Sequence, residues 1–412
     1  MEKKDDIKKR IDEIYDETVE IRRDLHMHPE LSEHEVRTAE KISGYLSRWG
    51  IEHRCGVAGN GIVAWIEGRK PAQADLLFRG VGIRADMDAL PVKELADVPF
   101  RSANEGVMHA CGHDIHTAVA LGSARILKEM ESEFSGAVKF FFQPSEETVG
   151  GAERMIAEGC LLDPPVDAVA GLHVAPLVPS GDLELCRGRM NAASTEFELT
   201  VSGKSCHGAH PDDGADPILA ASHIVAGLQS IISRNLSPAN PGLITVGKFI
   251  SGTANNVIPE KAVLSGIIRA LDNETQRFIK DRLLSFASST AEAFGARADI
   301  YFRDSYPALV NDDFLLDTVR EAAQECLGSD RIHFMPEPSL GSDDFSYFSN
   351  AVRSIYFNLG TKKEGGPSSD ILHSAYYCPD EESMKSGMLI EIVSALRLLD
   401  MKGSDCSGIS HQ

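Results

Sequence analysis

The chain has 412 residues, of which 42% are apolar and 25% are charged, a composition that excludes a disordered, collagen-like or coiled-coil chain. This length predicts two or three domains, each able to bury a sizeable core. The formal net charge of −21 makes nucleic acid an unfavourable partner, because an acidic surface repels the phosphate backbone.

The sequence shows no sign of a membrane or secretory segment. No apolar run approaches the roughly 18–20 residues that cross a bilayer. The charged segment 1–17 lacks the apolar stretch and cleavage site of a secretory signal, so we expect a cytoplasmic protein. The eight cysteines are scattered, which is typical of thiols, metal ligands or core residues: Cys55, Cys111, Cys160, Cys186, Cys206, Cys326, Cys378 and Cys406.

The first part of the chain alternates between helical and strand patterns. Apolar residues spaced three or four apart predict helices, and short apolar runs predict strands. The predicted helices are 6–24, 35–49, 116–131 and 151–157, and the predicted strands are 61–67, 81–85, 137–142 and 166–172. This alternation predicts an α/β layer with a largely parallel sheet.

The rhythm changes near residue 188 and returns after residue 303. The order β-α-β-β-α-β is that of a ferredoxin-like unit, with strands at 195–201, 243–250, 262–269 and 297–302 and helices at 217–233 and 274–294. Helix 312–327, strand 352–359 and helix 380–400 then follow, with a loop at 360–369 and a frayed tail at 402–412. We therefore predict an α/β domain (1–187 and 304–412) with an inserted α+β domain (188–303).

The densest group of chemically active residues is MHACGHDIH at 108–116, just before a predicted helix. A cysteine and a histidine separated by one residue, such as Cys111 and His113, can reach one metal ion or a close pair of ions. A buried cysteine beside a capped helix terminus would give the same pattern. The cluster alone therefore leaves both interpretations open.

Other candidate ligands follow predicted strands. Glu146 and Glu147 come directly after strand 137–142, and in extended backbone two adjacent carboxylates would point opposite ways. Asp86 and His173 also stand at strand ends, where ligands of open α/β sheets bind. Helix-terminal acids and a locally bonded histidine are the simpler interpretation of each feature alone. Together they predict the ligand set of a two-metal site.

The motifs resemble those of the aminoacylase, auxin-amino-acid-conjugate hydrolase and hippurate hydrolase branch of the co-catalytic metallopeptidases. They follow one another along nearly the whole chain: RRDLHMHPELSEHE (22–35), GIRADMDALP (82–91), MHACGHDIHTA (108–118), FFFQPSEE (140–147), GLHVAPLVPSG (171–181), GKSCHGAHPDDGADPI (203–218), GTANNVIP (252–259), GIIRALD (266–272), GSDDFSYF (341–348) and LHS (372–374). The resemblance implies a metal-binding α/β catalytic domain with an inserted ferredoxin-like lid domain that often dimerises.

The resemblance also implies the residues of the site. The ligands of two divalent ions would be Cys111, His113, Glu147, His173 and His373, and Glu146 would be the general base. The residues alone do not separate the roles of Glu146 and Glu147. The implied reaction is hydrolysis of the amide bond of N-acyl amino acids by an activated water. A dipeptidase or carboxypeptidase with the same site is the alternative.

The resemblance assigns three residues of the lid. His207 would stabilise the oxyanion, and Asn256 and Arg269 would bind substrate, since an arginine suits the carboxylate of an amino acid. Zinc is the favoured metal, with manganese, cobalt or nickel as alternatives. A homodimer or larger homo-oligomer formed through the lid is expected. The roles of six further residues stay open: Cys206, His210, Asp86, Asp88, Asp343 and Asp344.

The residues argue against two other classes of protein. A thiol hydrolase with Cys111 as nucleophile would have no use for Glu147, His173 and His373 together. A binding module on the same fold would be expected to lack the base or several ligands. The formal GxGxxA at 80–85 runs into a strand rather than opening a helix, so it is not a dinucleotide fingerprint.

Overall fold

The computed structural model describes residues 2–71, 75–363 and 371–403, and these residues form two compact units. Unit 1 comprises Met1–Gly188, Val310–Pro336 and Tyr347–Gln412, and unit 2 comprises Arg189–Leu309 and Glu337–Ser346. Each unit has its own apolar core. Residues 304–309 and 337–346 pack with unit 2, whereas the division drawn from sequence grouped them with the catalytic domain.

Unit 1 is built on an eight-stranded sheet with the strand order β1-β2-β4-β3-β5-β16-β6-β15. Its strands are β1 (Glu52–Val57), β2 (Gly61–Glu67), β3 (Gly80–Asp86), β4 (Ala137–Gln143), β5 (Ala168–Pro179), β6 (Leu183–Leu185), β15 (Ile332–Phe334) and β16 (Arg353–Lys362). The central strands β4, β3, β5 and β16 are parallel, and β15 is parallel to β6. Strands β1 and β2 pair antiparallel with their neighbours, and β6 is antiparallel to β16. The sheet is therefore mixed, with parallel pairs at its centre and at the β15 edge.

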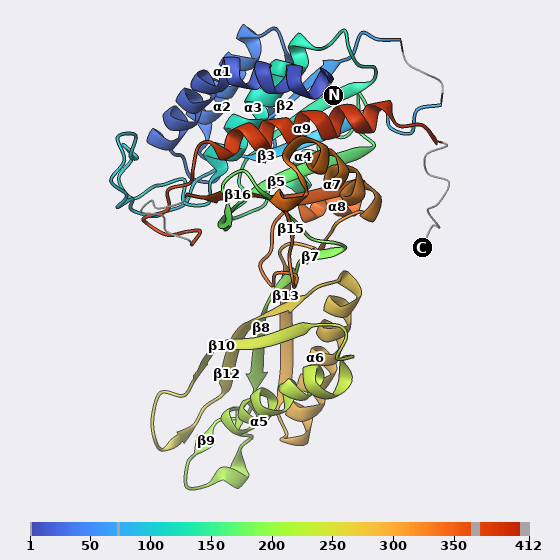
Figure 1. The fold of residues 1–412 in the computed structure, drawn as a ribbon. Coiled ribbons are helices and arrows are strands. Elements are labelled where there is room, and N and C mark those ends of the chain that lie inside the picture. The colour runs from blue at the N-terminus through green and yellow to red at the C-terminus, as the bar shows by residue number, and fades with distance from the viewer. Residues whose placement is uncertain (1, 72–74, 364–370, 404–412) are drawn as a thin grey trace. The chain divides into compact units, whose positions relative to one another are not determined.

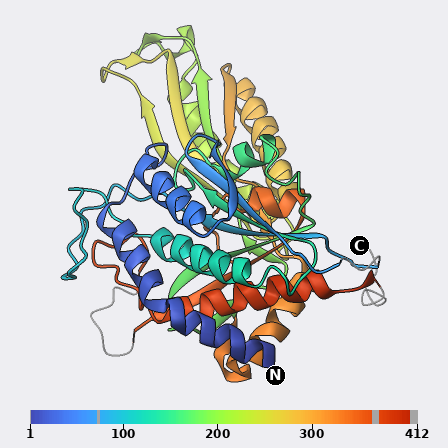
Figure 2. The same cartoon turned by 90° about the horizontal axis from the view of Figure 1, so that it is seen from above.

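The helices of unit 1 cover both faces of this sheet. They are α1 (Glu2–Met27), α2 (Val36–Arg48), α3 (His113–Glu129), α4 (Ala152–Ala157), α7 (Asp313–Leu327), α8 (Ser346–Ala351) and α9 (Ser383–Asp400). Helices α1, α3 and α9 lie side by side (Figures 1 and 2). Phe140 and Phe142 of β4 join the core cluster that includes these helices, whereas Phe141 stacks on Phe348 of α8 at 5.2 Å. Burial on both faces explains why β4 is an unbroken apolar run.

Unit 2 contains the predicted β-α-β-β-α-β order. Its main elements are β8 (Ala193–Ser202), α5 (Pro217–Ser230), β10 (Gly242–Ser251), β12 (Lys261–Ala270), α6 (Asn273–Ala293) and β13 (Arg297–Asp304). The antiparallel sheet has the order β10-β12-β8-β13 (Figure 1), which is the ferredoxin-like arrangement. Phe197, Leu199 and Val201 face the helices from alternate positions of β8, as the period of two predicts.

Short elements complete the chain, and the sequence pattern did not predict them. They are β7 (Arg189–Asn191), β9 (Cys206–His207), β11 (Val257–Ile258), β14 (Leu309–Val310), the 3₁₀ turns Pro211–Asp213 and Ser329–Arg331 and the π-helical turn Ile231–Asn235. Strand β16 continues to Lys362, so the first residues of the predicted loop 360–369 are strand. The rest of that loop from residue 364 and the predicted tail from residue 404 lie outside the described residues.

No helix among the residues that the structure describes is long and apolar enough to cross a membrane.

Candidate metal centre

The five predicted ligands meet in unit 1, beyond the carboxyl ends of the central parallel strands. Cys111 lies in the turn before α3, and His113 is the first residue of that helix. Glu147 follows β4, and His173 lies inside β5. The strand continues to Pro179, so the prediction that His173 ends its strand was wrong. His373 is brought to the site by a hydrogen bond from its amide to the carbonyl of Ala110, at 2.9 Å.

Gly112 shapes the turn that carries the first two ligands. It adopts a left-handed conformation (φ 84°) as the N-cap of α3, which places Cys111 and His113 on either side of it. A Cβ atom at Gly112 would come within 2.5 Å of Cγ2 of Val174. Glycine is therefore required here twice, for its backbone conformation and for the close approach of β5.

The candidate ligand atoms form overlapping groups. Atoms of Cys111, His113 and His173 lie within 4.8 Å of one another, and so do atoms of Cys111, Glu147 and His373. Cys111 Sγ lies 3.4 Å from His173 Nε2, and His373 Nε2 lies 3.4 Å from Glu147 Oε1. Because Cys111 belongs to both groups, the arrangement suits two neighbouring ions rather than one.

Two buried atoms of this cluster indicate that a cation belongs there. Nε2 of His113 and Oε1 of Glu147 are buried and have no hydrogen-bond partner within the described part of the chain. Buried polar atoms are normally paired, because leaving them without a partner costs about 1–3 kcal/mol each. Imidazole, thiolate and carboxylate are also the donor set that zinc and related divalent ions bind. The residues present therefore fit a pair of divalent metal ions.

The electrostatics of the cluster favour the same conclusion. Burial raises the pKa of the Cys111 thiol, which would keep it protonated without a cation beside it. Burial alone would lower the pKa of His113, but the charge of Asp86 outweighs this and raises that pKa. The nearby Glu147 carboxylate likewise raises the pKa of His373. The site thus attracts positive charge, which a bound metal would supply in place of protons.

Glu146 and Glu147 do not point opposite ways, as extended backbone would require. Strand β4 ends at Gln143, and Ser145 adopts a left-handed conformation (φ 60°) that starts a turn. Ligand atoms of His113, Glu146 and Glu147 consequently lie within 4.8 Å of one another. Only 7% of Glu146 is exposed. Both carboxylates therefore face the same cluster.

Asp86 and Asp88 lie next to the candidate ligands and help to orient them. Asp88 accepts hydrogen bonds on Oδ2 from the amide of Glu147 at 3.1 Å and from Ser32 Oγ at 2.7 Å. The Nδ1 atom of His113 lies 2.9 Å from the backbone carbonyl of Asp88, which orients the imidazole. Asp86 forms a buried ion pair with Arg84 at 2.5 Å. Although burial alone would raise it, Arg84 and the neighbouring histidines hold the pKa of Asp86 well below its usual range.

His116 is a supporting residue that the sequence reasoning missed. It lies three residues after His113 in α3, is almost fully buried and bonds both Asp86 and the strand that carries His173. Its signal was the spacing HDIH, because residues three apart share one face of a helix.

The residues predicted for the lid lie in unit 2. His207 of β9 pairs with Val257 of β11, and the amide of Gly208 donates to the carbonyl of Asn256 at 2.8 Å. His207 and Asn256 are therefore neighbours across a two-stranded ribbon. Arg269 lies on β12 and donates from Nη1 to Ser342 Oγ at 2.8 Å.

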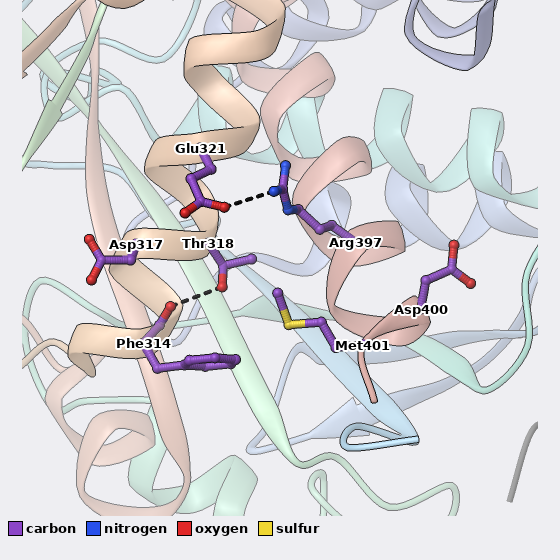
Figure 3. A pocket seen from close by; sticks show the side chains of 7 residues that line it. All are labelled: Phe314, Asp317, Thr318, Glu321, Arg397, Asp400 and Met401. Carbon is purple, nitrogen blue, oxygen red and sulfur yellow. Dashed lines mark hydrogen bonds and ion pairs between the residues drawn. The ribbon is translucent and has the colours of Figure 1, made fainter. Parts of the chain in front are cut away.

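Unit 1 also has a hollow that contains none of the predicted ligands. It lies between α7 and α9, has a volume of about 540 Å³, and is lined by Phe314, Asp317, Thr318, Glu321, Arg397, Asp400 and Met401 (Figure 3). Arg397 pairs with Glu321 at 2.7 Å and with Glu325 at 3.0 Å. The arginine of this hollow is thus neutralised by the protein itself, and the hollow is separate from the metal centre.

Comparison with known proteins identifies the family of the chain. Residues 82–391 match the model of peptidase family M20/M25/M40. An N-acetyl-L-cysteine deacetylase from Bacillus subtilis is 35% identical over 92% of this chain and 88% of its own length. Thermostable carboxypeptidase 2 from Saccharolobus solfataricus is 37% identical over 95% of this chain and 98% of its own length.

A solved structure is similar to most of this chain. A Bacillus subtilis protein described as a dinuclear metal-binding peptidase superposes with a TM-score of 0.81 and 31% identity, covering 94% of this chain and 99% of its own. The family model, the relatives and the cluster of ligands lead to one conclusion. The chain belongs to peptidase family M20/M25/M40 and is a metal-dependent hydrolase of amide bonds.

Proposed function

We propose that the chain releases amino acids from N-acyl amino acids, with Glu146 as the general base. The observation that carries this proposal is the convergence of Glu146 and Glu147 on His113. Two carboxylates in one place can divide the work, because one can ligate while the other handles protons. The deacetylase relative acts on an N-acyl amino acid by its name, which favours this substrate class.

Five residues would hold two divalent ions: Cys111, His113, Glu147, His173 and His373. Zinc is the favoured ion because a thiolate is among the ligands, with manganese, cobalt or nickel as alternatives. When bound, the ions would supply positive charge that polarises the scissile carbonyl and makes a nearby water more acidic. Glu146 would take a proton from the attacking water and return it to the nitrogen of the leaving amine.

His207 is proposed to stabilise the oxyanion that forms when the carbonyl is attacked. The amide of Ala209 donates to Nδ1 of His207 at 3.0 Å. An Nδ1 atom that accepts a hydrogen bond carries no proton, so the neutral ring has its hydrogen on Nε2. His207 is exposed, and its Nε2–H group is therefore available as a donor to a developing negative charge.

Arg269 and Asn256 are proposed to bind the substrate. Arg269 is half-buried and forms no ion pair with any residue of the described ranges, and its Nη1 atom donates to the hydroxyl of Ser342. Burial lowers the pKa of Arg269, which reflects the cost of an unneutralised guanidinium. A carboxylate such as that of an amino acid would neutralise it through paired hydrogen bonds. Asn256 is exposed beside His207 and would contribute polar contacts.

We also propose that unit 2 acts as a lid and dimerisation domain. Strand β10 is an edge of the four-stranded sheet, and Phe249 and Ile250 on it are 40% and 57% exposed. An edge strand with exposed apolar side chains can pair with a second copy. A homodimer would give twice the chain mass in analytical ultracentrifugation, and Ile250→Lys would shift it toward the monomer.

The proposed location is the cytoplasm. Seven cysteines lie among the described residues, and all of them are free thiols. Free thiols in this number are typical of a reducing compartment.

The experiment is an assay of amino-acid release from N-acetyl, N-benzoyl and N-lauroyl amino acids and from dipeptides. It compares native, metal-stripped and metal-restored protein, together with Glu146→Gln and the exposed control Glu153→Gln. Loss of activity on stripping, recovery with metal and an inactive Glu146→Gln variant would support the proposal. Preference for dipeptides would favour the peptidase alternative, which the name of the carboxypeptidase relative supports. Activity that resists stripping but not thiol alkylation would refute the mechanism.

A further inference from the structure

The segment between α1 and α2 touches the loop that carries Glu146, although none of its residues was assigned a role. It belongs to the motif at 22–35. The amide of Glu33 donates to Ser145 Oγ at 3.0 Å. The Glu35 carboxylate accepts on Oε1 from the amide of Ser145 at 2.8 Å and from its hydroxyl at 3.3 Å. The segment therefore forms three hydrogen bonds with Ser145, the residue immediately before Glu146.

Glu35 has no comparable role in its own helix. It is the N-cap residue of α2, yet its side chain makes no capping hydrogen bond. Glu30 does that work instead, since its carboxylate accepts from the amides of Arg37 at 3.1 Å and Thr38 at 2.8 Å. Glu35 is nevertheless fully buried, and a buried carboxylate is costly unless its hydrogen bonds are made. Ser145 supplies two of them, and Asn60 Nδ2 a third at 3.0 Å.

The backbone conformation of Ser145 explains why these hydrogen bonds matter. Its φ of 60° is in the left-handed region, which non-glycine residues rarely adopt unless their surroundings hold them there. Its side chain is fully buried, and its hydroxyl both donates to Glu35 and accepts from Glu33. The turn at Ser145 is also what directs Glu146 and Glu147 to the same cluster.

We propose that Glu35 is a positioning residue for the general base: its carboxylate holds Ser145 in the left-handed turn that aims Glu146 at the reacting water. The inference rests on the proposed role of Glu146. It assigns to Glu35 no contact with substrate or metal. Its effect would be on the rate of the chemical step, because a misplaced base is present but out of reach.

The test compares three substitutions of Glu35 in the metal-loaded protein. Glu35→Met keeps the volume but accepts no hydrogen bond, Glu35→Asp keeps the charge but is one methylene shorter, and Glu35→Gln keeps an acceptor oxygen. We expect kcat to fall roughly tenfold or more in Glu35→Met, since displacement of a reacting group by about 1 Å can cost about a hundredfold. The kcat of Glu35→Asp should lie between those of wild type and Glu35→Met, and Glu35→Gln should retain most of the wild-type kcat. KM and metal content should be unchanged in all three variants.

The control is Glu30→Met, which removes the carboxylate that caps α2. It should lower the melting temperature and leave kcat unchanged. If Glu35→Met does not fold, Glu35→Asp carries the test. Wild-type kcat in a folded Glu35→Met or Glu35→Asp variant would overturn the inference, and so would equal losses in Glu35→Met and Glu35→Gln.

A crystal structure of the same variant gives a readout independent of the reaction. We expect φ of Ser145 to leave the left-handed region and the Glu146 carboxylate to move away from His113. Unchanged positions of Ser145 and Glu146 would overturn the inference even if the enzyme acts as proposed. An active Glu146→Gln variant would instead refute the proposed function, so the two failures are distinguishable.

Discussion

The imidazole of His116 links the carboxylate of Asp86 to the strand that carries His173. Its Nε2 atom accepts from the amide of Val174 at 3.0 Å, so its proton is on Nδ1, which donates to Asp86 Oδ1 at 2.6 Å. Asp86 Oδ2 in turn lies 3.7 Å from Nε2 of His113. His116 thus holds Asp86, which lies close to one candidate ligand, against the strand that carries another.

This relationship predicts that His116→Ala weakens metal binding. Loss of such a supporting contact typically costs about 10- to 100-fold in metal affinity. The measurement is a titration of the stripped protein with zinc in the presence of a competing chelator. His53→Ala is the control, because His53 bonds Ser43 and its own loop away from the site. Equal affinities of the two variants would contradict the assignment.

A second prediction concerns Gly112. Alanine there would have to adopt φ 84° and would meet Val174 at 2.5 Å. The backbone conformation costs about 1–2 kcal/mol and the overpacking about 1–3 kcal/mol. Gly106→Ala isolates the first effect, because Gly106 has φ 80° but no atom within 4 Å of an added Cβ. Urea unfolding should show a clearly larger loss of stability for Gly112→Ala. Similar losses of stability in Gly112→Ala and Gly106→Ala would mean that β5 shifts to make room for the new methyl group.

A third prediction concerns Arg269 and the carboxylate of the substrate. A hydrogen-bonded charge pair contributes about 1.5–3 kcal/mol, so Arg269→Met should lower kcat/KM about 10- to 100-fold for an N-acyl amino acid. The same variant should barely change the rate for the corresponding amino acid amide, which has no carboxylate. Arg303→Met is the control, because Arg303 is exposed and already paired with Glu196. Equal losses on the two substrates would argue against carboxylate recognition.

A fourth prediction concerns Glu391 in the core. Burial raises its pKa to about 8, although the hydrogen bond from Ser123 Oγ at 2.7 Å opposes the shift. In the unfolded chain the carboxyl titrates near 4.5. Between these values the folded protein keeps a proton that the unfolded chain releases, so the free energy of unfolding falls as pH rises, by about 1.4 kcal/mol per pH unit from this group.

Glu391→Gln should remove this contribution, because the amide stays neutral at every pH. The stability of Glu391→Gln relative to wild type should therefore increase between pH 5 and pH 8 in urea unfolding. Glu40→Gln, on the exposed side of α2, should show no such trend. A difference between Glu391→Gln and wild type that stays constant with pH would show that Glu391 is not neutral in the folded core.

Much of the fold was predictable because most of its helices and strands have a recognisable local sequence pattern. The alternation of Phe197, Leu199 and Val201 predicted β8, and the apolar run at 137–142 predicted β4. Short pairing strands such as β9 and β11 were missed, because two residues carry no period. The antiparallel edge strand β1 was missed as well, since its exposed residues Glu52 and Arg54 give no apolar pattern.

The residue types alone indicate which positions could form a metal centre, since thiol, imidazole and carboxylate groups are chemically suited to bind metal wherever they lie. Their arrangement depends on contacts that form only in the folded chain. A backbone hydrogen bond from His373 to Ala110 brings this histidine beside Cys111, although the two residues are far apart in the chain. The left-handed turn at Ser145 reverses the alternation expected of Glu146 and Glu147, and Glu35, distant in the chain, holds that turn. A local sequence pattern indicates whether a segment favours helix or strand. The direction in which a side chain points depends on contacts made after the chain has folded.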